Sequence, residues 1–201
     1  MINKILLSMF KAFAFVLLVG VIIPIAAAAD QHRPARPPDV HFYPTPHEVV
    51  EIMLRLVDLN KDDVVYDLGC GDGRIVIAAA KKAGARAYGF DIDPKMVKIS
   101  RENVNKEGLK HLVTIEEQDI FELDLSNASV ITLYLLPELN LRLLPQLNRL
   151  KPGVRIVSHD FDIEGAAPDV EATVYRPGEG TSKVYMWTTP LRNTPYPITF
   201  P

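Results

Sequence analysis

The stretch Val64-Val65-Tyr66-Asp67-Leu68-Gly69-Cys70-Gly71-Asp72-Gly73 decides the fold of this chain. Its apolar, β-branched first half predicts a strand, which ends in an acid and is followed by glycines at alternate positions. A helical pattern over residues 74–83 follows directly. A strand, a tight glycine turn and a helix start are how α/β folds hold a nucleotide-like ligand, because glycine lets the backbone approach the ligand closely. The spacing G-x-G-x-G differs from the G-x-G-x-x-G of dinucleotide-binding folds.

After this turn, strand and helix patterns alternate along the chain. Further strands are predicted over residues 87–90, 113–117, 129–135 and 154–158. Helices are predicted from Asp93-Pro94 to about residue 108, and over residues 137–150 with a kink or break at Pro145. This alternation indicates an α/β fold with a Rossmann-like, doubly wound, mostly parallel sheet.

The two ends of the domain add a helix and a hairpin. Thr45 as N-cap, Pro46 at the first helical position and Glu48 form a capping box for a helix that we expect to end near residues 59–60. Residues 170–175 and 183–187 read as a C-terminal antiparallel hairpin. About eight residues separate it from the preceding strand, too few for a helical crossover, so we expect a connection without a helix there.

Residues 1–29 read as a leader that is not part of the fold. They contain no acid, the two lysines Lys4 and Lys11, and an apolar stretch ending in alanines, which is typical of a secretory signal peptide. The alternative is an uncleaved N-terminal membrane anchor, for which the apolar stretch is short and is interrupted by Pro24. The sequence therefore predicts a periplasmic or secreted protein, or one anchored to the inner membrane, without indicating the side of the membrane. Residues 30–42 read as a Pro-rich linker, 43–190 as the domain and 191–201 as a C-terminal tail.

Composition excludes several classes of partner. The formal net charge is −3, and a mildly acidic chain is a poor general binder of phosphate backbones, so we do not expect nucleic acid as a partner. Cys70 is the single cysteine, which leaves no intramolecular disulfide, and we expect it to fill the turn as a small side chain. The five histidines have no metal-ligand spacing, so no metal is predicted.

The order of these features resembles the class I S-adenosylmethionine-dependent methyltransferases. The matching features are the Asp67–Gly73 motif after the first strand, Asp91 ending the second, Asp119 after the third, Lys151-Pro152-Gly153 before the fifth, and the terminal hairpin. Tyr43-Pro-Thr-Pro46, Leu133-Tyr-Leu-Leu-Pro137 and Ser158-His-Asp-Phe161 resemble, more narrowly, small prokaryotic relatives of the mitochondrial lysine methyltransferases that act on the adenine nucleotide translocase and the ATP synthase c-subunit. The resemblance implies S-adenosyl-L-methionine as co-substrate and a protein lysine as target.

The resemblance also implies roles for the residues around the glycine turn. Gly69, Gly71 and Gly73 would let the backbone pack against the ribose and the amino acid end of the donor. Asp67 would accept hydrogen bonds from the ammonium group of the donor, and Asp91 would accept from both ribose hydroxyls, as acids do at this place in NAD-binding folds.

Residues farther from the turn would complete the donor site. Asp119 suits the adenine amino group, with Ile120 and Phe121 as an apolar wall, although Asp119 is also explained as a turn residue. Tyr43 and Thr45 would close over the amino acid end. For Thr45 the helix cap is an equally complete explanation.

The methyl acceptor would enter beside the fourth strand. Tyr134-Leu135-Leu136-Pro137 ends this strand at the topological switch point, and an apolar mouth there would favour the uncharged form of a lysine nucleophile. His159 and Asp160 are further acceptor-side candidates, with a structural hydrogen-bonding pair as the alternative. No general base is assigned. Two other functions stay open at this point, an NAD-dependent oxidoreductase and an exported, non-catalytic module that binds the donor.

Overall fold

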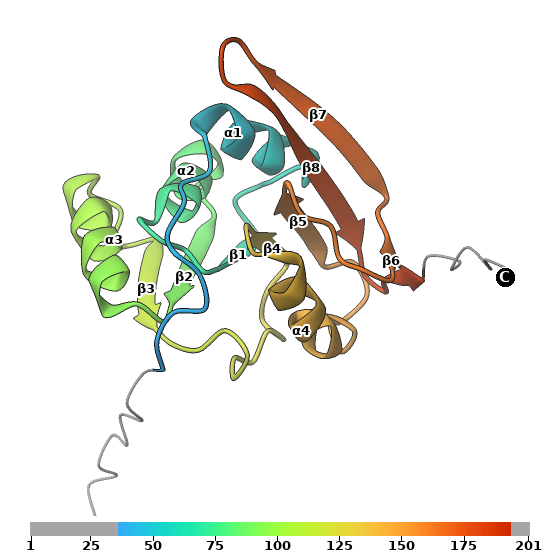
Figure 1. Cartoon of the computed structure of the whole chain (residues 1–201). Coiled ribbons are helices and arrows are strands. Elements are labelled where there is room, and N and C mark those ends of the chain that lie inside the picture. Colours follow the sequence, from blue (N-terminus) through green and yellow to red (C-terminus); the bar gives the residue numbers. More distant parts are fainter. Residues whose placement is uncertain (1–35, 194–201) are drawn as a thin grey trace, which may run out of the picture. The chain divides into compact units, whose positions relative to one another are not determined.

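The computed structural model describes residues 36–193 and places the strand of the glycine motif, β1 (Val64–Leu68), in the middle of a seven-stranded sheet. The sheet has the order β3-β2-β1-β4-β5-β8-β7 (Figure 1). The other strands are β2 (Arg86–Asp91), β3 (Val113–Glu117), β4 (Val130–Leu133), β5 (Arg155–His159), β7 (Val170–Arg176) and β8 (Gly180–Thr188). Strands β1 to β5 are parallel, whereas β8 and β7 pair antiparallel as the predicted C-terminal hairpin. The doubly wound, mostly parallel sheet is confirmed.

Helices cover both faces of this sheet. Side chains of α1 (His47–Leu56), α2 (Arg74–Ala83) and α3 (Pro94–Lys106) join one apolar cluster, and those of α4 (Pro137–Leu147) join the other (Figure 1). The strands feed both clusters alternately, because successive side chains point to opposite faces. The chain reverses its direction across the sheet between β1 and β4, and this topological switch point is where such sheets bind ligands.

Helix boundaries follow local sequence where a glycine or a cap sets them. Helix α2 starts after Gly73 and ends at Gly84, and both glycines have left-handed backbone conformations. The Asp93 side chain accepts a hydrogen bond from the Lys95 N–H and caps α3, with Pro94 in its first turn. No helix lies between β5 and β7, as predicted.

Several predicted boundaries need correction. Helix α1 begins at His47 and ends at Leu56; its cap residue is Pro46, no side chain caps it, and the predicted Thr45 capping box is wrong. The Thr45 hydroxyl instead lies against a distant side chain, described below. Strand β4 ends at Leu133, so the following tyrosine and leucines belong to a loop. Helix α4 runs through Pro145 without a break and ends at Leu147, two residues later.

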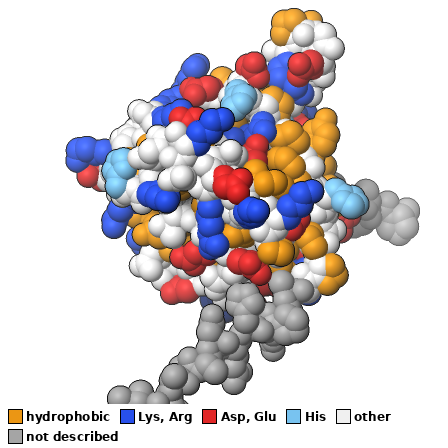
Figure 2. Space-filling view, turned by 90° about the vertical axis from the view of Figure 1, so that its left-hand side faces the viewer, with side chains coloured by type: hydrophobic (Ala, Val, Ile, Leu, Met, Phe, Trp, Pro, Cys, Tyr) orange, Lys and Arg blue, Asp and Glu red, His pale blue; other side chains and the backbone are white. Residues whose placement is uncertain are grey.

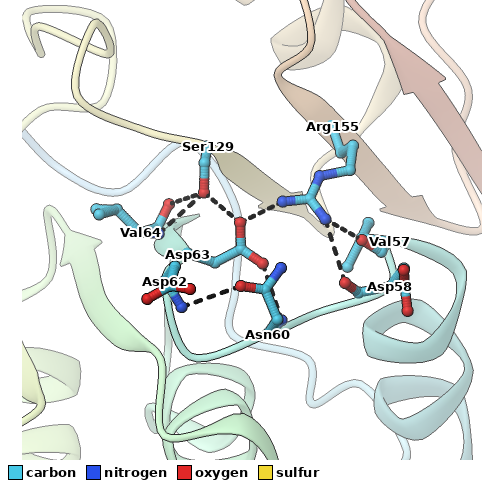
Figure 3. A network of polar contacts seen from close by, with 8 residues as sticks. All are labelled: Val57, Asp58, Asn60, Asp62, Asp63, Val64, Ser129 and Arg155. Carbon is cyan, nitrogen blue, oxygen red and sulfur yellow. Dashed lines mark hydrogen bonds and ion pairs between the residues drawn. The ribbon is translucent and has the colours of Figure 1, made fainter.

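A polar network holds the amino ends of the strands, at the edge opposite the glycine turn (Figure 3). Arg155 at the start of β5 forms an ion pair with Asp63, and it donates to the carbonyl groups of Val57 and Asp58 that follow α1. The Ser129 hydroxyl donates to the same Asp63 carboxylate at 2.7 Å. These contacts tie the end of α1 to the amino ends of β1, β4 and β5.

Residues at both ends of the described chain pack on the domain. Residues 36–43, which we call the N-terminal strap, run past the carboxyl ends of β2 and β1 and lead into α1 (Figure 1), so their part of the expected linker belongs to the domain. Strand β9 (Arg192–Asn193) of the expected tail pairs with β6 (Ala166–Ala167). None of the helices within residues 36–193 is long and apolar enough to cross a membrane. The predicted leader, residues 1–29, lies outside the described residues.

Candidate functional site

A cavity with room for about 110 Å³ of water, open to solvent on one side, lies at the carboxyl ends of β1, β2 and β4 and beneath the N-terminal strap. The switch point is the usual place of small-molecule sites in α/β folds. Most of the residues predicted to contact the donor line the cavity: Tyr43, Thr45, Asp67, Gly69, Gly71, Asp91, Asp119 and Ile120. Of the acceptor-side candidates, Tyr134 and Leu135 line it.

Asp67 is a buried acid with one carboxylate oxygen that lacks a hydrogen-bond partner among the described residues. Its side chain stands at the carboxyl end of β1, and the residue is only 2% exposed. One oxygen accepts a hydrogen bond from the Thr132 hydroxyl at 2.7 Å, while the other has no hydrogen-bond partner within residues 36–193. Burial raises the pKa of this carboxyl to about 7. A buried carboxylate oxygen on a cavity wall without a partner fits a ligand that brings a positive charge and N–H donors.

Asp91 is held rigidly by the backbone at the end of β2. Its two oxygens accept hydrogen bonds from the N–H groups of Gly71 (2.8 Å) and Asp93 (2.9 Å). Burial raises the pKa of Asp91 above its usual value, although these bonds favour the charged form. Each carboxylate oxygen has a second lone pair, so a fixed carboxylate on the cavity wall can receive two hydroxyl groups of a diol.

The three glycines of the turn divide into two roles. Gly71 lines the cavity with φ +53°, and a Cβ on it would overlap the ring of Phe42 in the strap. A Cβ on Gly69 would come within 3.0 Å of Leu135. Gly73 is not among the lining residues; it has φ +80° at the start of α2, and its Cβ position lies 3.1 Å from Cβ of Ser100 in α3. Close packing of α2 on α3 therefore explains Gly73, and its donor contact stays a prediction.

Asp119 lines the cavity beyond β2, where its side chain contacts the N-terminal strap. Both of its oxygens accept from the Arg36 guanidinium, at 2.7 and 3.1 Å, and one also accepts from the Phe121 N–H at 3.0 Å. Burial alone would raise the pKa of Asp119, but the bonds from Arg36 and Phe121 outweigh it and the pKa is lowered. Phe121 is not a cavity wall, because its ring faces the Arg142 guanidinium at 3.7 Å. Sequence reasoning missed Arg36, which stands in a stretch without any motif.

Aromatic side chains form the wall next to β4. Tyr134 lines the cavity, and the 74% exposed ring of Tyr43 meets it edge-on at 6.5 Å between centroids. His159 lies behind Tyr134, with the ring centroids 3.9 Å apart. Burial raises the pKa of the Tyr134 phenol, so this hydroxyl stays neutral at physiological pH.

The remaining acceptor-side candidates do not reach the cavity. His159 is almost fully buried, and Pro137 is the first residue of α4. Asp160 has a left-handed backbone with φ +57°, and its carboxylate accepts from the Lys183 N–H at 2.8 Å. The alternative of a structural pair therefore describes His159 and Asp160 better than a direct contact with substrate.

Comparison with known proteins decides the family. Residues 67–170 match the family model described as the ANTKMT methyltransferase domain. A protein-lysine N-methyltransferase of Saccharolobus islandicus is 41% identical over 152 residues, which cover 75% of this chain and 94% of that protein. The chain belongs to the ANTKMT methyltransferase domain family. The family's donor, S-adenosylmethionine, is therefore the co-substrate, and methyl transfer replaces the oxidoreductase alternative.

Two further proteins are similar to this member of the ANTKMT family. The human lysine N-methyltransferase of the ATP synthase c-subunit is 30% identical over 147 residues, which cover 73% of this chain and 60% of that protein. A crystal structure described as an RNA methyltransferase from Salinibacter ruber, in complex with S-adenosyl-L-homocysteine, has 48% sequence identity and a TM-score of 0.69. The match covers 76% of this chain and 97% of that one.

The cavity of this ANTKMT-family chain fits the donor chemically. The unpartnered oxygen of Asp67 suits the ammonium group of S-adenosylmethionine, and Asp91 suits the ribose diol. Asp119 and Ile120 line the same cavity, and their contact with the adenine stays a prediction. Acids outnumber basic residues on the walls, with Asp39, Asp67, Asp72, Asp91, Asp93 and Asp119 against Arg36 and Arg74, which favours a cationic ligand.

Arg74 is a second residue that sequence reasoning missed. Its guanidinium pairs with Asp72 at 2.6 Å and donates to the Thr45 carbonyl at 2.9 Å. It thereby ties the start of α1 to the glycine turn. An arginine directly after the last glycine of the motif was the available signal, but nothing in the sequence indicated its partner.

Proposed function

We propose that this methyltransferase modifies the side-chain amine of a lysine in a protein. The proposal rests on the wall of Tyr43, Tyr134 and Leu135 beside the donor residues, because a lysine presents its amine on an apolar stem that such a wall can receive. The relatives named as lysine methyltransferases, one of them covered over 94% of its length, support the same acceptor.

The chain's own residues have to bind, align and exclude water. When bound, S-adenosylmethionine supplies a methyl group already activated by a sulfonium, so that alignment with the nucleophile is the main requirement. Asp67 would bind the ammonium group of the donor, and Asp91 would bind its ribose hydroxyls. Tyr134 and Leu135 would desolvate the entering lysine, which lowers the lysine pKa and frees the lone pair that attacks.

Methylation of RNA is the second candidate, because the Salinibacter ruber structure is described as an RNA methyltransferase. The charge of this chain favours the protein acceptor over RNA. The net charge is −3, and on the described part of the face in Figure 2 basic and acidic side chains are interspersed without a continuous basic stripe. Binding to nucleic acid depends on such a stripe.

The test supplies the full-length protein with S-adenosylmethionine carrying a tritiated methyl group. Protein and RNA extracts of the source cells are offered separately, and both are hydrolysed to amino acids and nucleosides. The expected result is label in N-methylated lysine, with much less label at limiting S-adenosylmethionine when Asp91→Ala replaces the wild type. Label in methylated nucleosides only would overturn the lysine acceptor in favour of RNA.

We further propose that residues 1–29 direct the domain to a membrane, as a cleaved signal peptide or as an anchor, and that the protein substrate is membrane-associated. The support is the composition of this leader, with two early lysines, no acid and an apolar stretch. The test uses a C-terminally tagged chain and measures three properties. These are the accessibility of the tag to protease in spheroplasts, the mass of the tagged chain, and the cell fraction in which it is found. A tagged chain of full mass that stays in the soluble cytosolic fraction would refute this proposal.

A further inference from the structure

A buried histidine stands directly behind the cavity wall. His159 at the end of β5 is 1% exposed, and its Nδ1 lies 3.3 Å from the hydroxyl oxygen of Thr45, which lines the cavity. On its other side, Nε2 lies 3.1 Å from the Ser182 hydroxyl and 3.3 Å from a carboxylate oxygen of Asp160. The Tyr134 ring packs on the imidazole face, so the histidine cannot turn without moving a cavity wall.

The groups around the ring decide where its proton sits. Burial lowers the pKa of His159 to about 4 although Asp160 opposes the shift, so the imidazole is neutral at physiological pH and carries one N–H. A carboxylate can only accept, so the Asp160 oxygen 3.3 Å from Nε2 favours the N–H on that nitrogen. Arg176 donates to the Ser182 oxygen at 3.4 Å, and the second lone pair of this oxygen can accept from the Nε2–H. Nδ1 is then an acceptor, and its available donor is the Thr45 hydroxyl.

We propose that His159 is a positioning residue: its Nδ1 accepts a hydrogen bond from the Thr45 hydroxyl, which leaves the lone pairs of the Thr45 oxygen to accept from a ligand in the cavity. The ligand group that fits is an amine N–H. Two amines meet in this enzyme, the α-ammonium of the donor and the methyl-accepting lysine; for the second of these the inference rests on the proposed function.

This assignment also says what Thr45 does not bind. A carboxylate needs a donor, and the Thr45 proton is committed to His159. The carboxylate end of the donor therefore has to be held elsewhere on the wall. Arg74 does not compete for the hydroxyl, because it binds the Thr45 backbone carbonyl.

The first test reads the proton itself and needs no turnover. In the full-length protein labelled with ¹⁵N-histidine, two-bond ¹H–¹⁵N correlations are expected to show His159 as the neutral Nε2–H tautomer. Asp160→Asn keeps the acceptor oxygen for the Lys183 N–H, and asparagine tolerates the left-handed backbone of this residue. Its amide would offer a donor to Nε2, so the tautomer is expected to switch to Nδ1–H. The exposed Asp162→Asn is the matched control and should leave the tautomer unchanged.

The second test locates the amine. Thr45→Val removes the hydroxyl at nearly constant shape, and Thr45→Ser retains it. For Thr45→Val we expect a loss of about tenfold either in S-adenosylhomocysteine affinity by calorimetry, which identifies the donor ammonium, or as a rise in KM for a lysine substrate, which identifies the acceptor. Thr45→Ser is expected to restore the affected parameter.

The outcomes separate this inference from the proposed function. A wild-type Nδ1–H tautomer or an imidazolium would overturn the role of His159, and so would a folded Thr45→Val enzyme that matches the wild type in both parameters. If no label enters lysine but Thr45→Val loses affinity for S-adenosylhomocysteine, the proposed function is refuted and this inference stands.

Discussion

Replacing Asp67 by asparagine should stabilise the free protein at pH 8. The carboxyl is buried, one oxygen has no partner within the described chain, and its pKa is raised to about 7. Asparagine keeps the acceptor for the Thr132 hydroxyl and removes the buried charge. The same change should weaken ligand binding, because it deletes the charge that we expect to receive the donor's ammonium group.

The magnitude follows from linkage between protonation and folding. The folded-state pKa of about 7 lies above the ordinary value of 3.8, so the unfolded chain gives up this proton first as the pH rises. Stability from this group is complete below pH 4 and is lost as the pH rises to 7. A shift of about three pKa units corresponds to about 4 kcal/mol of unfolding free energy. At pH 8 the Asp67→Asn protein should therefore be more stable than the wild type by up to about 4 kcal/mol, and at pH 4 the two should be nearly equal.

Urea unfolding of both proteins at pH 4 and pH 8 measures this difference, and all other titrating groups cancel in the comparison. Calorimetry with S-adenosylhomocysteine at pH 8 gives the binding arm, in which Asp67→Asn should lose at least tenfold in affinity. The reasoning is refuted if the stability difference between the two proteins is the same at both pH values. Unchanged ligand affinity in the folded variant would remove Asp67 from the ammonium site.

Three further changes test other parts of the structure. Asp91→Ala should weaken S-adenosylhomocysteine binding at least tenfold, about 1.4 kcal/mol, by calorimetry, whereas the exposed Asp62→Ala should not change it. Gly73→Ala should lower the unfolding free energy by about 2 kcal/mol and Gly84→Ala by about 1 kcal/mol, because both have positive φ but only the first also crowds α3; equal losses in urea would contradict this. Arg155→Met should lower stability by about 2 kcal/mol while ligand affinity stays at the wild-type level, and a loss of affinity would show that the opposite edge of the sheet acts on the site.

The donor-site residues at the glycine turn could be predicted because they stand in one short stretch of sequence. Asp67 lies in the strand, Gly69 and Gly71 follow it directly, and a strand, turn and helix of this kind adopt one arrangement. Asp91 was predictable as well, since the acid ending the next parallel strand must lie beside the turn. In each case the geometry of adjacent parallel strands is enough, and no long-range contact has to be known.

The rest depends on contacts between distant parts of the chain. The local sequence explains Thr45 completely as a helix cap, which is wrong, because its hydroxyl contacts His159, 114 residues away. The Arg36 guanidinium holds Asp119 across 83 residues, from a segment that composition predicts to be a linker. Phe42 covers Gly71 from the same segment. No periodicity or spacing encodes such pairs, because each is set by how the strap lies on the finished sheet.

Asp67 connects the stability of the empty domain with its choice of ligand. Burying a carboxylate without a full set of partners lowers the stability of the free protein, and packed faces and the Arg155 network at the other edge of the sheet offset that loss. A ligand with an ammonium group pairs with this carboxylate and removes the free-energy cost of burying its charge. Relief of that cost then adds to the binding free energy of the ligand. A neutral ligand of the same shape gains nothing from this source. The buried acid would therefore discriminate in favour of a ligand with an ammonium group before any contact with the methyl acceptor is made.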